Sequence, residues 1–173
     1  MVHSRPVTRT DLADVHCSIA RTMEVLGDAW GALILRDVFA GITRFDAIQA
    51  DLGISRKVLA TRLDELVARG ILARRPYSEH PPRFDYVPTE CGRDLHPVLL
   101  AIMAYGDRWL APDGPPVEIH HAECGHRATA VVTCSECGAP LDAQDALAQA
   151  GPGARTGPGT RRLTALLAAR AGR

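Results

Sequence analysis

Hydrophobic side chains recur at helical spacing through the first half of the chain, separated by short turns that contain glycine. Residues 17–26, 30–39 and 44–52 each show this pattern, and we therefore expect three helices. The second segment is strongly apolar, which is typical of a buried helix. Residues 53–55, Gly-Ile-Ser, then predict a tight turn, because glycine can take the left-handed conformation that such a corner needs.

A fourth helix with two different faces is predicted directly after this turn. Ser55 is a favourable N-cap and Gly70 lies just past the expected end. The stripe predicted to be buried consists of Leu59, Leu63, Leu66 and Val67. The opposite face carries Lys57, Thr61, Asp64 and Ala68, flanked by Arg56 and Arg62. Since cations and small residues come first and acids later, this helix is suited to entering a DNA groove with its N-terminus first.

A β-hairpin is predicted next, with strands at residues 71–77 and 83–87 around a polar tip at residues 78–82. A helix-turn-helix followed by such a hairpin is a winged helix, whose second helix reads DNA. From residue 55 to residue 83 there are seven Lys or Arg against three Asp or Glu, although the whole chain has 20 of each class. This local positive charge supports the prediction. Taken alone, a charged helix face is more often merely solvated.

A longer amphipathic helix is expected after the hairpin, beginning at Thr89 as its cap and ending near residue 109. Pro97 should kink it. Its apolar positions are Leu95, Val98, Leu99, Ile102, Met103 and Trp109. This is more apolar surface than so small a domain can cover. We therefore expect the helix to pack with the first helix against a second subunit; packing within the chain is the alternative.

Two matched pairs of metal-ligand residues follow the proline- and glycine-rich linker at residues 111–116. The pairs are His121-x-x-Cys124-Gly125 and Cys134-x-x-Cys137-Gly138. Three thiolates and one imidazole suit tetrahedral Zn²⁺, and four protein ligands leave no open position, so we expect a structural zinc site. His120 and His126 are alternative sources of the imidazole. A metal-free hairpin with reduced cysteines is the competing interpretation.

Composition adds three expectations. Formal net charge is +0, so a nucleic-acid partner must be argued from local charge. No apolar run approaches the roughly 18 residues of a membrane span, and the first 14 residues contain no secretory apolar core. An odd number of cysteines, five, argues against a disulfide framework. We expect a cytoplasmic, nucleoid-associated protein without a membrane partner.

Several motifs between residues 15 and 110 closely resemble the HxlR-type transcriptional regulators, winged-helix relatives of the MarR group. The shared features are Cys17 at the first helix, the Gly27-Asp28-x-Trp30 element, Leu35-Arg36, Arg44-Phe45, the Gly-Ile-Ser turn and the step from Thr89 to Gly92. The resemblance implies a homodimer that binds a pseudo-palindromic operator in double-stranded DNA and has no catalytic residue. The family's cysteine is usually followed by proline, whereas this chain has Ser18, which loosens the expected helix start.

The resemblance also draws attention to Cys17, because some regulators of this kind use the matching cysteine to sense quinones, aldehydes or oxidants. A small buried packing residue is the alternative, as free cysteine often is.

The expected fold is mainly α with a small β-wing, a winged helix-turn-helix, plus a small C-terminal β module similar to a zinc ribbon. The expected divisions are a flexible N-terminus (1–14), the DNA-binding and dimerisation domain (15–110), the linker (111–116), the zinc module (117–142) and a flexible basic tail (143–173). The last ten residues or so of the tail could form a helix if a surface were available.

The expected function is a sequence-specific regulator, a repressor rather than an activator, with an effector that the sequence does not identify. The residues expected to contact DNA are Ser55, Arg56, Lys57, Ala60, Thr61, Arg62, Arg74, Arg75 and Arg83. A winged helix that binds protein instead of DNA is the alternative. An enzyme is disfavoured, because we find neither an open metal position nor a nucleophile paired with a base.

Overall fold

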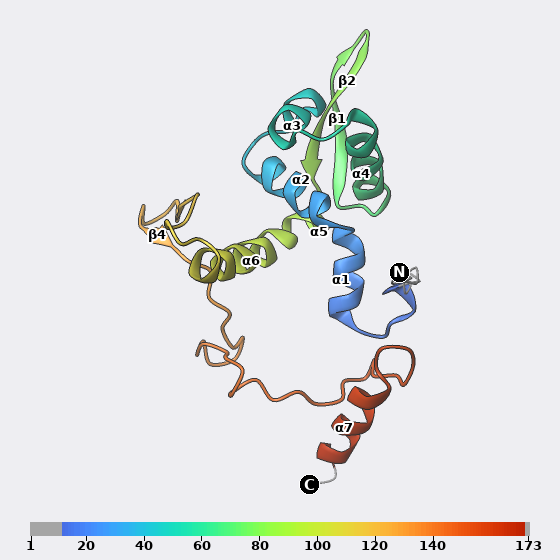
Figure 1. Cartoon of the computed structure of the whole chain (residues 1–173), viewed down its shortest axis with the longest axis vertical. Helices are drawn as coiled ribbons and strands as arrows, with labels where there is room; N and C mark the ends of the chain where they lie inside the picture. The colour runs from blue at the N-terminus through green and yellow to red at the C-terminus, as the bar shows by residue number, and fades with distance from the viewer. Residues whose placement is uncertain (1–11, 172–173) are drawn as a thin grey trace, which may run out of the picture. The chain divides into compact units, whose positions relative to one another are not determined.

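The computed structural model describes residues 12–171, which divide into two compact units (Figure 1). The larger unit is residues 29–146, and the smaller joins the N-terminal segment up to Asp28 to the chain from Leu147 onward. None of the helices in the described range is long and apolar enough to cross a bilayer. The residues expected to contact DNA, between Ser55 and Arg83, all lie in the larger unit.

The helix-turn-helix begins the larger unit with α2 (Ala29–Phe39), α3 (Phe45–Leu52) and α4 (Arg56–Ala68). Gly53 ends α3 in the left-handed conformation with φ 64°, as the sequence predicts. The Ser55 hydroxyl accepts a hydrogen bond from the Val58 amide at 3.3 Å and so caps α4. Ile54 and Leu59, on either side of this cap, are both buried, which fixes the angle at which the chain enters α4.

The core of the larger unit lies where α2, α3, α4 and the wing meet. The largest fully buried apolar side chains are Ile34, Leu35, Ile48, Leu59, Leu63 and Leu72. These come from all three helices and from the first strand, so α4 is held by its buried stripe and its opposite face is left to solvent.

The wing is an antiparallel hairpin of β1 (Leu72–Glu79) and β2 (Pro82–Pro88). Both strands run further toward the tip than expected, because Pro82 begins β2 at a position where its missing N–H is tolerated. The chain before α3 lies beside β2: the Tyr86 amide donates to the Thr43 carbonyl at 2.8 Å. The start of α3 is thereby fixed to the wing.

The single long helix expected after the wing is divided into α5 (Glu90–Arg93) and α6 (Leu95–Trp109). The Thr89 hydroxyl caps α5 by accepting from the Gly92 amide at 3.0 Å. The break at Asp94 follows from Pro97, whose ring would clash with the carbonyl four residues earlier, that of Arg93. The expected kink is therefore a full interruption.

The segment after the linker contains only two-residue strands, β3 (Ile119–His120) and β4 (Arg127–Ala128), which pair antiparallel. Thr133 and Pro140 form an isolated bridge further along. The segment is thus two short hairpins in succession, each built around one pair of predicted metal ligands.

The smaller unit holds a 3₁₀ turn η1 (Leu12–Asp14), α1 (Ser18–Leu26) and a C-terminal helix, α7 (Arg161–Ala171). α7 lies at the end of the basic tail expected at residues 143–173, where the sequence allowed for a short helix. Within this unit Val15, Thr160 and Leu167 are buried, and the chain just before α7 lies against the N-terminal segment, with Gly159 beside Val15. Most of the flexible N-terminus expected at residues 1–14 falls outside the described residues.

Candidate nucleic-acid interface

The exposed face of α4 presents the residues that the sequence singles out. Arg56, Lys57 and Thr61 are exposed, Ala60 is half-buried, and Leu59 and Leu63 are buried on the other side. Ser55 is exposed too, but its hydroxyl is engaged in the helix cap. The N-terminal half of α4 thus offers two cations, one hydroxyl and one small side chain to a groove.

Arg56 is held by groups from α3. Its guanidinium contacts Asp46 at 2.6 Å and lies over the Phe45 ring, 4.7 Å from the centroid. The side chains of Arg56 and Asp46 are 66% and 75% exposed. Exposed ion pairs contribute at most about 1 kcal/mol, so a DNA phosphate could displace Asp46 at little cost.

Arg62 is placed differently from Arg56. Its side chain is only 23% exposed, and its NH1 contacts Glu65 Oε2 at 2.6 Å on the same helix. Reaching DNA would require it to leave this pair. Its role in DNA contact stays a prediction, with less geometric support than that of Arg56 or Lys57.

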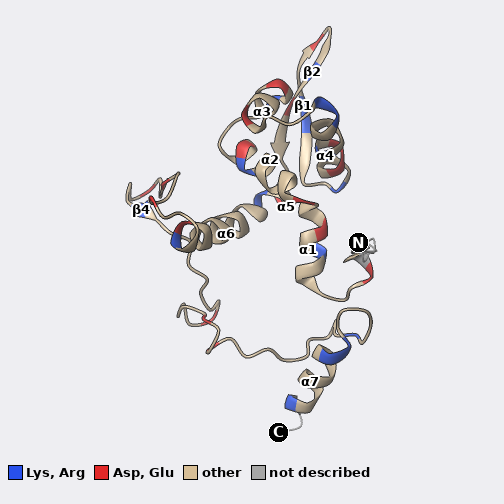
Figure 2. Ribbon diagram, in the orientation of Figure 1, with Lys and Arg blue, Asp and Glu red and all other residues tan. Residues whose placement is uncertain are grey.

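Some cations of the wing form ion pairs with acidic side chains and others do not. Arg74 contacts Asp64 of α4, and Arg75 lies 3.5 Å from Asp85 across the hairpin. Arg83 is exposed and, like Lys57, has no ion pair with any residue in the described range. Figure 2 shows Lys and Arg along α4 and β1 with acids among them. The positive surface is therefore partly neutralised by its own neighbours in the free protein.

Arg44 is a further cation at this surface and is not among the residues expected from the sequence to contact DNA. It caps the start of α3, lies 4.5 Å from the centroid of the Tyr77 ring and 3.6 Å from Asp85. It lines a groove of about 570 Å³ together with Phe45, Asp46, Ala47, Arg56, Tyr77, Pro82, Arg83, Phe84 and Tyr86. Three arginines from α3, α4 and the wing thus face one groove. In the sequence, Arg44 is marked only by its position directly before a helix and by the Arg44-Phe45 element shared with the HxlR-type regulators.

A buried acid lies behind this surface. Asp37 of α2 is 1% exposed and accepts hydrogen bonds from Arg36 Nε at 2.9 Å and NH2 at 2.6 Å. Arg36 also donates to Asp51 of α3 at 2.7 Å, so the network ties α2 to α3. Burial raises the pKa of Asp37, and the nearby Arg36 guanidinium only partly opposes this.

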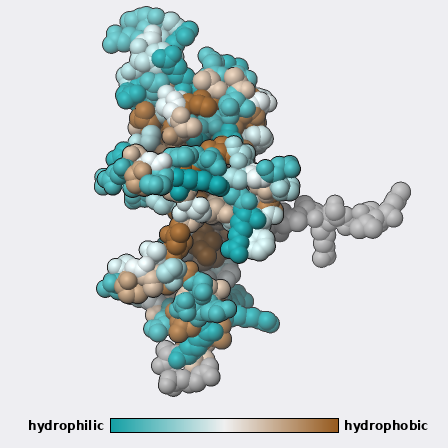
Figure 3. All heavy atoms as spheres, turned by 90° about the vertical axis from the view of Figure 1, so that its left-hand side faces the viewer, coloured by the Kyte–Doolittle hydropathy of each residue, from teal (hydrophilic) through white to brown (hydrophobic). Residues whose placement is uncertain are grey.

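The side of α6 away from the predicted zinc module carries an uncovered apolar stripe. Val98, Ile102, Tyr105 and Trp109 are 38%, 50%, 63% and 62% exposed, and they recur at helical spacing. No residue of α6 is buried. Figure 3 shows hydrophobic side chains reaching the surface among hydrophilic ones on one side of the molecule. An apolar stripe on one face of a helix is typical of a surface that a partner covers.

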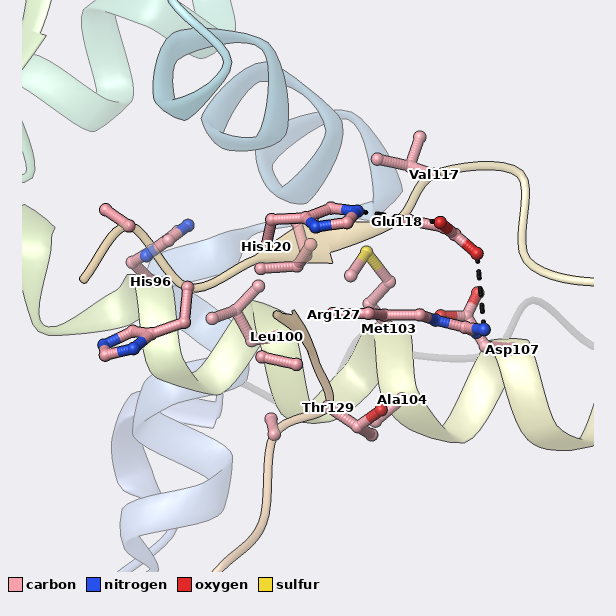
Figure 4. Close-up of a pocket in the computed structure, with 15 residues that line it drawn as sticks. His96, Leu100, Met103, Ala104, Asp107, Val117, Glu118, His120, Arg127 and Thr129 are labelled. Atoms are coloured by element: carbon pink, nitrogen blue, oxygen red, sulfur yellow. Dashed lines mark ion pairs between the residues drawn. The ribbon is translucent and has the colours of Figure 1, made fainter. Parts of the chain in front are cut away.

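The opposite side of α6 forms one wall of a cavity of about 380 Å³, whose other wall is the chain around β3 and β4 (Figure 4). Leu100 and Met103 of α6 face it. On the other wall, Glu118 links β3 to β4, because its carboxylate lies 3.7 Å from His120 of β3 and 3.3 Å from Arg127 of β4.

The predicted metal ligands lie as two separate pairs. His121 Nδ1 is 3.4 Å from Cys124 Sγ, and the Cys134 and Cys137 side chains are in hydrogen-bond contact. The backbone amides of Cys137 and Glu136 lower the pKa of the Cys134 thiol. In the part of the chain that the structure describes, no group of three or more His, Cys, Asp or Glu is gathered around one point. Cys17 lies elsewhere, as the half-buried N-cap of α1.

Comparison with known proteins decides the family. The HxlR-like helix-turn-helix family matches residues 25–114, which is more than half of the chain. The chain belongs to this family. As an HxlR-like protein it is a transcriptional regulator and not an enzyme. The match covers the helix-turn-helix, the wing and α6, so the resemblance and the winged-helix fold expected from the sequence are confirmed.

Two relatives extend the likeness beyond the family match. The chain is 40% identical over 137 residues to MT3179, an uncharacterized HTH-type transcriptional regulator of Mycobacterium tuberculosis (strain CDC 1551 / Oshkosh), covering 79% of this chain and 87% of the relative. The crystal structure of PA1607, a candidate transcription factor, matches this HxlR-like chain with a TM-score of 0.71 and 35% sequence identity. The match covers 81% of this chain and 99% of PA1607.

A third likeness concerns redox regulation. The redox regulator HypR in its reduced form has a TM-score of 0.51 and 29% identity, and the match covers 56% of this chain and 99% of HypR.

Proposed function

We propose that this HxlR-like protein binds a pseudo-palindromic operator as a homodimer and represses transcription there. The observation that carries the proposal is the placement of Arg56 and Lys57 on the exposed start of α4, beside a groove that Arg44 and Arg83 also line. Backbone contacts position a protein on DNA, while side chains at the start of a recognition helix read base edges. The wing would then lie along the flanking phosphates.

The α6 stripe supports the homodimer. A two-fold dimer would present two copies of α4 to DNA about one helical turn apart, roughly 34–36 Å. A single α4 carries too few contacts to select one site in a genome, so the dimer is what makes the site specific.

Footprinting on the DNA upstream of the protein's own gene tests the proposal. Arg56→Ala and Lys57→Ala should each cost about 1–3 kcal/mol of operator affinity if the side chain reads a base, that is, roughly ten- to a hundred-fold. Arg127→Ala, which removes a cation on β4, is the matched control and should bind as the wild type does. Wild-type affinity in both α4 variants would remove α4 as the recognition helix. A reporter gene should be expressed more strongly when the regulator is absent; lower expression would identify an activator.

Regulation through Cys17 is a second proposal, favoured by the likeness to HypR. Cys17 is half-buried and free, so a small electrophile or oxidant could reach it. A thiol-modifying reagent should weaken operator binding by the wild type and not by Cys17→Ser, whereas Cys91→Ser, at an exposed cysteine of α5, should respond as the wild type does. Equal sensitivity of the wild type and Cys17→Ser would rule Cys17 out.

A further inference from the structure

The two short hairpins after the linker have the same backbone conformation. In the first knuckle, residues 121–126, the His121 amide donates to the His126 carbonyl at 2.9 Å and the Gly125 amide donates to the His121 carbonyl at 2.7 Å. In the second knuckle, residues 134–139, the Cys134 amide donates to the Ala139 carbonyl at 2.8 Å and the Gly138 amide to the Cys134 carbonyl at 2.8 Å. The hydrogen bonds correspond one to one.

The glycines of the two knuckles match as well. Gly125 has φ 69° and Gly138 has φ 73°, a left-handed conformation that L side chains rarely adopt. Each glycine turns the chain back directly after a cysteine, so that the side chains three residues apart come together on the inside of the turn. Both knuckles therefore offer a pair of metal-ligand side chains in the same geometry.

This correspondence identifies the fourth ligand that the sequence left open. His121 occupies the position of Cys134, and its Nδ1 lies 3.4 Å from Cys124 Sγ. His120 is one residue outside the knuckle, with its Nδ1 3.1 Å from the Gly125 carbonyl and its Nε2 3.7 Å from Glu118. His126 occupies the position of Ala139, which is not a ligand position. The imidazole that pairs with a thiol is therefore that of His121.

The region that carries the knuckles has no core of its own. Between residues 117 and 142 no side chain is buried, and Val117, Val131 and Val132 are 55%, 66% and 59% exposed. Its regular strands are only two residues long. Hairpins of this size are marginal in water, and small segments without a core usually depend on a metal or a disulfide.

We propose that His121, Cys124, Cys134 and Cys137 bind one Zn²⁺ ion in a closed tetrahedral site that joins the two knuckles. Binding would replace the thiol protons of three cysteines by zinc–sulfur bonds of about 2.3 Å and release three protons, while neutral His121 supplies the fourth bond. The structure holds the ligands as two pairs, and the seven residues between the knuckles, 127–133, can span up to about 23 Å. The ion would bring the pairs together.

The site would act on the rest of the regulator through α6. His121 and its neighbours β3 and β4 form the wall of the cavity that faces Leu100 and Met103 of α6 (Figure 4). Zinc would fix this wall, and thereby steady the helix whose other side carries the exposed stripe. With all four positions taken by protein, the ion would have a structural role and no exchangeable water for catalysis.

Metal analysis of the purified full chain tests the proposal. We expect one zinc per chain, and with Co²⁺ in place of zinc we expect the absorption bands of tetrahedral cobalt with thiolate ligands. His121→Ala and Cys134→Ser each remove one ligand, so each should lower the zinc affinity by about ten-fold or more. The matched controls His120→Ala, His126→Ala and Cys91→Ser should keep one zinc per chain.

Three results would overturn the proposal. A wild-type chain that neither contains zinc nor takes up Zn²⁺ or Co²⁺ under reducing conditions would remove the site. Unchanged zinc affinity in Cys134→Ser would remove the second knuckle from it. Loss of zinc in His126→Ala together with retention in His121→Ala would contradict the correspondence of the knuckles. Circular dichroism of each variant shows whether the helices remain folded. Operator binding is measured separately, because the site and the DNA-binding proposal can fail independently.

Discussion

Gly92 lies against the backbone at the point where the wing meets α5. A methyl group added to it would collide with the Ile71 carbonyl oxygen, which already accepts hydrogen bonds from the amide and the hydroxyl of Thr89. Neither backbone segment can move without disturbing the α5 cap. The position therefore requires glycine because of close packing, not because of a positive φ.

We expect Gly92→Ala to lower the free energy of unfolding by about 1–3 kcal/mol, as overpacking in a tight core does. Urea denaturation measures this change. Gly106→Ala is the matched control in α6, where an added methyl group meets no atom within 4 Å, and it should raise stability by roughly 0.5–1 kcal/mol. Equal stability of Gly92→Ala and wild type would show that Ile71 can move away.

The buried carboxyl of Asp37 predicts a pH dependence. Burial raises its pKa, so the folded protein binds this proton more tightly than the unfolded chain does. Its contribution to stability is therefore complete below the ordinary pKa of about 3.9 and is lost as pH rises through the raised pKa. Asp37→Asn should remove this term, so Tm should fall less in the variant than in the wild type as the pH is raised from about 4.

Thermal unfolding of the wild type and of Asp37→Asn at a series of pH values from about 4 upward measures the effect. Asp113→Asn is the control, because it removes a carboxylate at an exposed position of the linker, outside the group formed by Asp37, Arg36 and Asp51. An identical pH dependence of Tm in wild type and Asp37→Asn would contradict the assignment of the term to Asp37.

At the scale of elements, sequence periodicity predicts most of what the structure contains. The turn at Gly53, the cap at Ser55 and the stripe of Leu59 and Leu63 depend on neighbours within one or two helical turns, and all are present. The division of the last helix could be anticipated only in part, since Pro97 marks a weak point but does not say how completely the helix breaks there.

Long-range contacts account for what sequence reasoning could not reach. The pairing of Arg56 with Asp46 and of Arg74 with Asp64 depends on how α3, α4 and β1 pack, which no local pattern encodes. The same holds for Arg44 in the groove with Arg83. The spacing already favoured His121 as the proposed imidazole ligand and left His120 and His126 as alternatives. The matching backbone of both knuckles is a further argument for His121 that the sequence alone does not contain.

The stripe on α6 leads to a prediction about assembly. Ile102 is at its centre and is half exposed in the single chain. If a second chain covers it, Ile102→Glu buries an unpaired charge, and the dissociation constant of the dimer should rise by roughly 10- to 100-fold or more. Sedimentation velocity measures this. Val131→Glu, an equally drastic change at a site outside the stripe, should leave the dimer intact. A dimer in both variants would place the interface elsewhere.

At the scale of the whole molecule, net neutrality limits how DNA can be bound. The cations of the proposed interface are mostly paired with acids in the free protein, so binding DNA through them would exchange carboxylates for phosphates. We expect operator affinity to fall log-linearly with salt, by about 0.9 per phosphate contacted, or roughly 10³–10⁵-fold between 50 and 200 mM for 6–10 contacts. Fluorescence anisotropy at several salt concentrations measures the slope. A partner bound with little salt dependence would indicate a protein ligand instead.

The burial of Val15 beside the tail has a practical consequence. A methyl group added to Gly159 would lie 2.9 Å from a Val15 methyl, and Leu167 of α7 is buried in the same unit. Val15 is two residues from Cys17. A sample that has lost its C-terminal residues by proteolysis, including Gly157 and Gly159, therefore has different neighbours beside the segment that leads to that thiol. Experiments that compare thiol reactivity between samples should therefore verify, by intact-mass measurement, that each sample retains the same C-terminus.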